Sequence, residues 1–270
     1  MPDQPLYDAL IVRIFQNHFR QGLDEFEFDR DELAKVAGQL GLRLPKNLGD
    51  LIYSFRYRKT LPEAITGTAT GKKEWSIESA GRAKYRFRLA GASRIIPRED
   101  LIAIKIPDAT PQIISTYART DEQALLAKLR YNRLIDIFLG IATYSLQSHL
   151  RTTVAGIGPI EIDEIYVGVN KGGQQFIIPV QAKGGKDKLG MIQTRQDLAY
   201  AAQKFPALIC RAISAQFMND EEKTIAMFEL TLEEDEVKVV EERHYRLVPG
   251  DSISAADLGN YSKRNRQSAG

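Results

Sequence analysis

Two strand-like runs joined by a glycine-rich turn are the feature that most constrains the fold of this chain. The runs are GPIEIDEIYVGVN (158–170) and FIIPVQAK (176–183), and KGGQ between them is typical of a turn. The apolar alternation of the first run slips by one residue at Asp163–Glu164, which predicts a bulge or a bend in that strand. The sequence therefore predicts a β-hairpin whose far end carries polar side chains where a core strand would carry apolar ones.

The polar side chains at the far end of this hairpin form a candidate catalytic group. Gln181 and Lys183 are two residues apart on one strand, so they project from the same face. Placing Asp163 beside them brings a carboxylate, an amide oxygen and an ammonium group to one point. Oxygen ligands suit Mg²⁺, and we expect Asp163, Gln181 and the backbone carbonyl of Ala182 to supply them. We expect Lys183 to orient or deprotonate an attacking water.

Asp163, followed on the next strand by Gln181-Ala182-Lys183, resembles the motif of the PD-(D/E)xK nuclease superfamily. Restriction endonucleases, Holliday-junction resolvases and RecB-type nucleases belong to this superfamily. The resemblance covers about Asp121 to Phe217 and implies an α/β (α+β) fold, in which helices flank a mixed sheet in the order αβββαβ. The chain offers five of these six elements in that order, with a helix from residue 121, strands at 160 and 176, a helix from 189 and a strand at 207.

Further residues resemble supporting parts of such a site. On the helix LGMIQTRQDLAYAAQKF, Gln and Tyr stand at the spacing of the Q-x-x-x-Y motif of RecB-type members. The superfamily usually has Glu or Asp where Gln181 stands, so we expect either that Glu161 or Glu164 restores the missing negative charge or that the site tolerates Gln. The supporting residues that we expect are Glu161, Glu164, Gln193, Gln196 and Tyr200.

One segment within the first hundred residues is basic. From Lys46 to Arg98 there are 12 Lys and Arg against 4 Asp and Glu, a net charge of +8, whereas the whole chain carries +2. Apolar spacing predicts three helices, the third opened by Pro45, and then a hairpin with one apolar and one basic face. This order resembles a winged helix-turn-helix domain, whose third helix and hairpin contact DNA. A small α+β domain with a solvated charged surface is the alternative.

Basic side chains in this N-terminal segment, and in the glycine-rich turn after the second strand, are the candidate DNA contacts. They are Lys46, Arg56, Arg58, Lys59, Lys72, Lys73, Lys84, Arg86, Arg88, Lys186 and Lys188. The turn is also open to a simpler interpretation, as a surface loop. Likewise, Asp163, Glu164 and Lys183 are open to interpretation as an ordinary ion-paired strand end.

These patterns divide the chain into segments. Residues 1–105 are predicted to form the winged-helix-like domain, 106–120 a linker, 121–260 the nuclease-like domain and 261–270 a mobile tail. Within the nuclease-like domain we expect a helical region from residue 121 to about 148, which Gly140 ends or bends, and a turn-rich break at 152–159. Apolar alternation at Phe228, Leu230 and Leu232 predicts a further strand, and the segment 232–248 predicts a hairpin with acidic outward positions.

Composition excludes several other classes of protein. Cys210 is the only cysteine and there are three histidines, so a disulfide framework or a Cys/His metal site is not expected. The first residues lack the pattern of a signal peptide, and the most apolar stretch, 134–146, is too short to span a bilayer. We therefore expect a cytoplasmic protein without a membrane partner. No phosphate-binding P-loop occurs in the sequence, so no nucleotide cofactor is expected.

The sequence thus predicts a Mg²⁺-dependent endonuclease, with Mn²⁺ as a possible substitute, that hydrolyses double-stranded DNA. A nuclease domain with its own DNA-binding domain is most similar to a type II restriction endonuclease, which implies a homodimer. A repair or junction-resolving nuclease is one alternative. The other is a winged-helix DNA-binding regulator whose nuclease-like domain is inactive.

Overall fold

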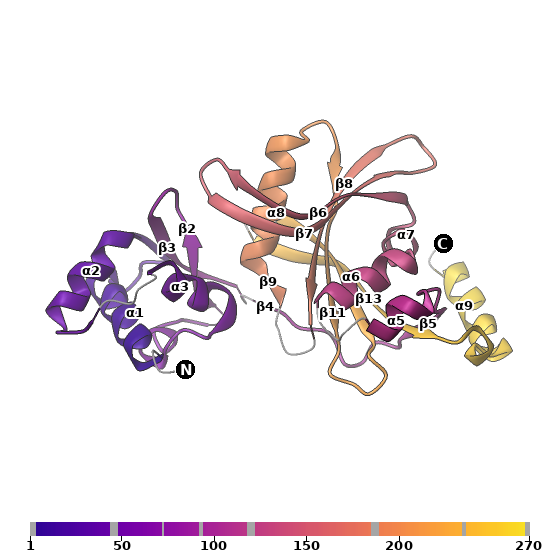
Figure 1. Cartoon of the computed structure of the whole chain (residues 1–270), viewed down its shortest axis with the longest axis horizontal. Helices are drawn as coiled ribbons and strands as arrows, with labels where there is room; N and C mark the ends of the chain where they lie inside the picture. Colours follow the sequence, from indigo (N-terminus) through magenta and orange to yellow (C-terminus); the bar gives the residue numbers. More distant parts are fainter. Residues whose placement is uncertain are drawn as a thin grey trace.

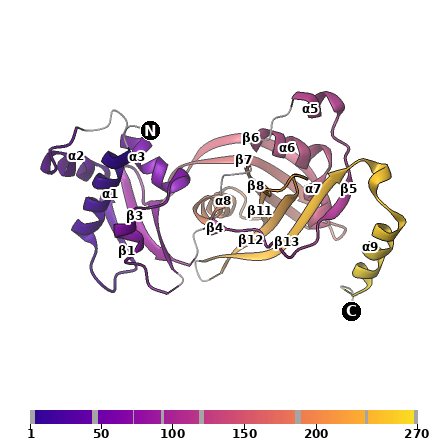
Figure 2. The same ribbon diagram turned by 90° about the horizontal axis from the view of Figure 1, so that it is seen from below.

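The structure, a computed structural model, describes residues 4–43, 48–71, 73–91, 94–117, 122–184, 189–233 and 236–267. It is a mixed α/β protein in which helices flank a mixed sheet, as expected from the sequence. Figure 1 shows a smaller N-terminal part, in indigo and violet, beside a larger part built around that sheet. Figure 2 shows α6 and α8 on opposite sides of the larger sheet.

The N-terminal part packs helices against a three-stranded antiparallel sheet of order β1-β3-β2. Its core is aromatic, because Phe15 of the first helix meets Trp75 and Phe87 of the sheet edge to face. Its elements are α1 (Gln4–His18), β1 (Glu25–Asp29), α2 (Arg30–Gln39), α3 (Leu48–Tyr53), the π-helical turn η1 (Ser54–Arg58), α4 (Glu63–Thr66), β2 (Glu74–Ser79) and β3 (Lys84–Ala90).

The first two helices and the β2–β3 hairpin are confirmed. Helix α2 begins after Asp29, whose backbone N–H donates to the Glu32 carboxylate over 2.9 Å. The third helix begins at Leu48 within the described residues and continues as η1, while Pro45 lies outside them. Strand β1 was not predicted. It pairs with β3 from Glu25 to Asp29 and turns the expected hairpin into a three-stranded sheet.

The region expected to be a linker contains a strand of the larger sheet. Strand β5 (Ile104–Pro107) runs parallel to β13, and Ile104 and Ile106 pack against the core of the larger part. Residues 106 and 107 therefore belong to the sheet, because burying these isoleucines stabilises an edge strand there. The neighbouring elements are β4 (Arg94–Ile95) and α5 (Gln112–Tyr117).

The larger sheet has the order β5-β13-β12-β11-β8-β7-β6, and β10 pairs with β8. Strand β8 runs parallel to β10 and β11, whereas β7 lies between β6 and β8 and is antiparallel to both. The elements after α5 are α6 (Glu122–Tyr131), α7 (Leu134–Leu139), β6 (Ala142–Val154), β7 (Gly158–Val169), β8 (Gln175–Lys183), β9 (Leu189–Gly190), α8 (Met191–Lys204), β10 (Ile209–Cys210), β11 (Ala212–Phe217), β12 (Ile225–Glu233), β13 (Glu236–Val248), the 3-10 turn η2 (Gly250–Ser252) and α9 (Ala255–Gln267).

The two faces of this sheet have separate apolar cores. Helices α6 and α7 cover one face, where Leu125 and Leu129 pack with Val180 of β8. Helix α8 covers the other face, where Tyr200 packs with Ile162 and other isoleucines of β7 and β8. Successive residues of β8 therefore alternate between the α6 side and the α8 side.

The predicted helical region 121–148 is wrong beyond residue 139. Helix α7 ends at Leu139 because Gly140 adopts a left-handed conformation with a φ of 65°, which favours glycine. From Ala142 onward the chain pairs with β7 as strand β6. The predicted break at 152–159 is correspondingly short, since the β6–β7 turn spans only 155–157.

The C-terminal elements agree in part with the sequence analysis. The predicted strand and hairpin after residue 225 are confirmed as β12 and β13. Residues 261–267, expected to be part of a mobile tail, instead continue helix α9, which docks through the Tyr261 hydroxyl on the backbone N–H of Lys105. Among the described residues, no helix is both long and apolar enough to cross a membrane.

Candidate functional site

The expected convergence of polar groups lies where β7 and β8 part. The two strands pair from Val169–Gln175 to Glu164–Val180, and the regular pairing ends there. Beyond this point the Asp163 carboxylate accepts a hydrogen bond from the backbone N–H of Ala182 over 2.8 Å. The side chain takes the place of a backbone acceptor, which explains the slip in the apolar alternation at this position.

Lys183 and Glu122 complete one side of this corner. The Lys183 ammonium donates to Glu122 Oε1 over 2.8 Å, and only 13% of the lysine side chain is exposed. Glu122 begins α6, so the helix brings a carboxylate that the sequence analysis did not identify. Burial raises the pKa of Asp163, as do the charges of Glu122 and Glu161, while the Ala182 hydrogen bond and the Lys183 charge oppose this shift.

Gln181 lies on the α8 side of the sheet and is held by two acceptors. Its amide nitrogen donates to Asp197 Oδ2 over 3.0 Å and to the backbone carbonyl of Glu161 over 3.4 Å. Gln181 Oε1 and Asp197 Oδ1 are both buried and have no hydrogen-bond partner among the described residues. Burial raises the pKa of Asp197 well above its ordinary range, and the nearby Asp163 charge adds to this effect.

The side-chain oxygen atoms at this corner are suitable ligands for a hard cation. Magnesium, which the superfamily resemblance implies, prefers oxygen ligands, and the two buried oxygens without partners are of the right chemical type. Within the described part of the chain, no three Asp, Glu, His or Cys side chains form a ready cation-binding group. Asp163 and the amide oxygen of Gln181 would therefore hold a cation together with groups such as the Ala182 carbonyl and Asp197.

Glu164 and Glu161, the two glutamates expected to support the site, lie in different environments. Glu164 is fully buried on the α6 side, where it accepts hydrogen bonds of 2.6 Å from both Arg130 and Ser145. The slip at Asp163–Glu164 turns it away from Gln181, so it is not the residue that restores a negative charge there. Glu161 is exposed and lies 3.3 Å from Arg151.

The expected residues of α8 lie at different depths. Gln196 and Tyr200 are buried, so this pair does not form a polar helix face in solvent. Tyr200 packs edge to face on Phe205, and burial raises its pKa. Gln193 is half-buried in the first turn of the helix.

Sequence reasoning missed Glu122 and Asp197, although Asp197 left a signal. It lies three and four residues before Tyr200 and Ala201, so all three share the helix face that packs on the sheet. An acidic residue on the helix face that packs on the sheet indicates a buried polar contact. Glu122 left no comparable signal, because acidic residues are common in the first turn of any helix.

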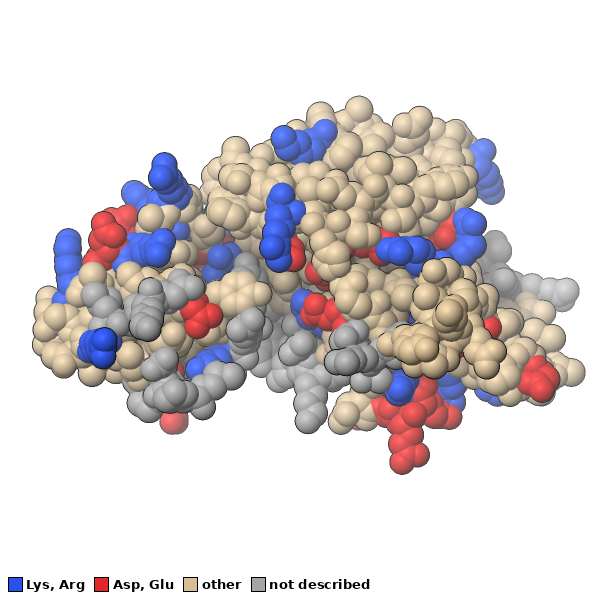
Figure 3. All heavy atoms as spheres, viewed as in Figure 1, with Lys and Arg blue, Asp and Glu red and all other residues tan. Residues whose placement is uncertain are grey.

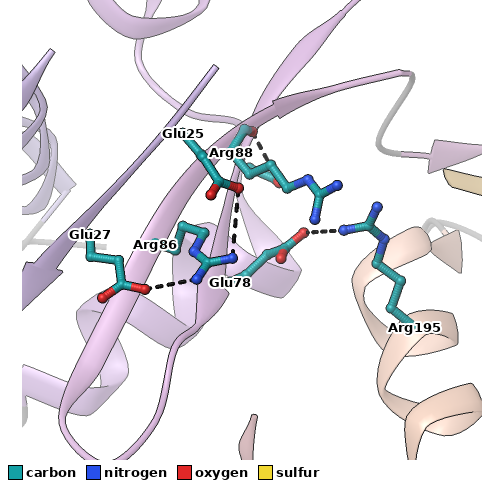
Figure 4. Close-up of polar contacts among 7 residues, drawn as sticks. Glu25, Glu27, Glu78, Arg86, Arg88 and Arg195 are labelled. Carbon is teal, nitrogen blue, oxygen red and sulfur yellow. Dashed lines mark hydrogen bonds and ion pairs between the residues drawn. The ribbon is translucent and has the colours of Figure 1, made fainter. Parts of the chain in front are cut away.

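The outer face of the N-terminal sheet carries both signs of charge. Arg86 lies 2.7 Å from Glu27 and 3.6 Å from Glu25, both on the unpredicted strand β1 (Figure 4). The Arg86 hydrogen bond holds the pKa of Glu27 below its usual range, with a smaller effect from Lys84. Arg88 faces Glu25 across the strand pair. The arginines of this face are therefore less available to phosphate than the hairpin alone suggested.

The other basic candidates are spread over the N-terminal part. Lys73 pairs with Asp24 at 2.8 Å, Lys59 lies over the Tyr7 ring at 5.6 Å, and Arg56 is half-buried. On the face drawn in Figure 3, basic and acidic side chains alternate over this part. The side chain of Arg58 lies outside the described part, as do the residues Lys46, Lys72, Lys186 and Lys188.

A direct link joins the N-terminal sheet to the helix of the candidate site. Glu78 of β2 pairs with Arg195 of α8 at 3.0 Å, two residues before Asp197 (Figure 4). Strand β4 also pairs with β9, immediately before α8.

Comparison of the chain with protein-family models, with curated proteins and with solved structures finds no match in any of the three.

Proposed function

We propose that this chain is a Mg²⁺-dependent endonuclease that hydrolyses phosphodiester bonds of double-stranded DNA. Three contacts where β7 and β8 part carry the proposal: Asp163 bonds to the Ala182 backbone, and Gln181 and Lys183 on either side of Ala182 bond to Asp197 and Glu122. A carboxylate, an amide oxygen and an ammonium group at one corner are the groups that metal-assisted phosphodiester hydrolysis needs.

The arrangement of elements supports a restriction-endonuclease-like fold for this part. Helix α6 (with α7), strands β6, β7 and β8, helix α8 and strand β11 follow the order αβββαβ that the resemblance implies. The helices and the three-stranded sheet of the N-terminal part are compatible with a winged-helix domain. Within this proposal the N-terminal part selects the DNA and the larger part cleaves it.

Each side chain at this corner has a separate role in the proposed reaction. Asp163 and Gln181 would hold the cation, which when bound polarises the phosphate and lowers the pKa of water. The Lys183 ammonium donates hydrogen bonds, so it would orient a water or a phosphate oxygen beside Asp163. Glu122 keeps that ammonium in place through their 2.8 Å contact. Burial of Gln181 and Asp197 behind this corner fixes the orientation of the amide.

Cleavage of plasmid DNA tests the proposal. Purified protein is incubated with supercoiled plasmid and Mg²⁺ or Mn²⁺, beside the variants D163N and K183A. K171A, in the exposed β7–β8 turn, is the matched control. We expect the wild type and K171A to cleave and the other two variants to lose at least a hundredfold in rate.

The products distinguish the kinds of nuclease. Discrete fragments indicate a type II restriction endonuclease, for which we propose a homodimer that cuts both strands. Cleavage of branched DNA alone indicates a junction-resolving nuclease. DNA binding without cleavage in either metal contradicts the nuclease proposal and favours a DNA-binding regulator.

A further inference from the structure

Gln181 of β8 and Asp197 of α8 form a buried pair between the sheet and the helix. Their side chains are each 2% exposed, and the amide nitrogen lies 3.0 Å from Asp197 Oδ2. The same nitrogen also faces the backbone carbonyl of Glu161. Both N–H groups of the amide are thereby directed to acceptors, so the orientation of the amide is fixed.

One side-chain oxygen of each residue in this pair is not hydrogen-bonded to any described residue. Gln181 Oε1 and Asp197 Oδ1 are buried without a hydrogen-bond partner among the described residues. Leaving a buried polar oxygen unpaired costs free energy, and a carboxylate costs more than an amide. A cation that contacts these oxygens would offset both costs at once.

We propose that Asp197 supplies the acidic group that the nuclease motif lacks at Gln181, and that the two side chains act as one carboxylate–amide pair in the cation site. The inference rests on the proposed function, and it names a residue outside the motif. The other nearby acids fit the role less well. Glu164 is turned to the α6 side and bonded to Arg130, and Glu161 faces solvent.

If Gln181 and Asp197 act as one pair, the amide and the carboxylate should be interchangeable between positions 181 and 197. Q181E alone places a carboxylate against Asp197 and against the Glu161 carbonyl, with no donor between them. D197N alone removes the acid and leaves two amides. The double variant Q181E/D197N again contains one acid and one amide, since the amide introduced at position 197 can donate to the carboxylate introduced at 181.

Binding of Mn²⁺ to the full chain tests this exchange without DNA. Metal-free wild type, Q181E, D197N and Q181E/D197N are titrated with Mn²⁺ by calorimetry, and thermal unfolding in EDTA is recorded for each. We expect D197N to weaken binding at least tenfold, Q181E to lower the Tm, and the double variant to recover both to near wild type. E229Q, a buried acid paired with Arg211 on the far side of β11, is the control. Its Tm falls but its Mn²⁺ affinity stays unchanged.

The outcomes separate this inference from the nuclease proposal. Wild-type affinity in D197N, no Mn²⁺ binding by the wild type, or a double variant no better than Q181E overturns the inference. If D197N does not fold, the comparison of Q181E with the double variant decides alone. Plasmid cleavage is measured in parallel. A wild type that binds Mn²⁺ with the expected exchange pattern but cuts no DNA leaves the pair standing and removes the nuclease function.

Discussion

Glu78 of β2 and Arg195 of α8 form an ion pair across the two parts of the molecule, with 3.0 Å between Oε1 and Nη1. Both side chains are less than a fifth exposed, so water screens the pair weakly. We expect E78Q to lower the free energy of unfolding by about 1.5–3 kcal/mol, the usual value of a hydrogen bond to a charged group. Urea unfolding measures this loss. E241Q, in the more exposed pair with Arg243, should cost less than about 1 kcal/mol. Equal losses in the two variants would contradict the assignment.

The Arg130–Glu164 pair should be more sensitive than any surface pair. Glu164 has no exposed surface, and Arg130 with Ser145 supplies its hydrogen bonds. Removing the guanidinium leaves a buried carboxylate without its cation, so we expect R130A to lose about 3–5 kcal/mol of stability in urea unfolding. R151A removes an arginine that is 80% exposed and should change stability by less than about 1 kcal/mol. A loss below about 1 kcal/mol in R130A would show that water enters the space left by Arg130 and hydrogen-bonds to the Glu164 carboxylate in its place.

The docking of α9 should depend on acid pH through Asp257. Hydrogen bonds from Ser254, and then from Lys105, lower the pKa of Asp257 to about 2. Because the folded pKa lies below the unfolded value of about 3.9, this stabilisation is fully present above pH 4 and is lost as the pH falls toward 2. NMR titration of the carboxyl carbon measures the pKa directly. Thermal unfolding of D257N should show less acid dependence than the wild type between pH 4 and 2, and a normal pKa for Asp257 would rule this out.

The β7–β8 hairpin was predictable because its information is local. Alternating apolar residues, a glycine-rich turn and one slip at Asp163 define two strands and the place where they part. Strand β6 was not predictable in the same way. The strand follows directly on a helix whose apolar residues are spaced at the helical period, and only Gly140 marks the point where the helix ends. What makes Ala142–Val154 a strand is pairing with β7, which is a tertiary contact.

The candidate site shows the same division. Asp163, Gln181 and Lys183 were found because they interrupt an apolar pattern on neighbouring strands. Glu122 and Asp197 join them from helices, at distances in sequence that no local pattern fixes. The acids of β1 that pair with Arg86 were also missed, because β1 meets β3 only through tertiary pairing with a segment far along the chain.

Removing an acid from the N-terminal sheet should strengthen DNA binding, if this face lies near phosphate in the proposed complex. Glu27 accepts a 2.7 Å hydrogen bond from Arg86, so E27Q leaves that guanidinium with a weaker partner. We expect tighter binding at low salt and a salt dependence steeper by about one unit of log–log slope. Fluorescence anisotropy with duplex DNA at several KCl concentrations measures both. E241Q, on the far part of the chain, serves as the control, and an unchanged slope in E27Q would place this face away from DNA.

Glu122 should control the rate of the proposed cleavage through Lys183. The Lys183 ammonium donates a hydrogen bond to the Glu122 carboxylate over 2.8 Å. E122A frees the lysine to leave Asp163, so we expect kcat to fall about 10- to 100-fold, as for other residues that position a catalytic group, with a smaller change in KM. E122Q keeps an oxygen acceptor and should retain more activity. Since Glu122 is 36% exposed, the stability of both variants should stay within about 1 kcal/mol of the wild type. K128A, on the same helix, is the control. Wild-type kcat in E122A would mean that packing alone holds Lys183.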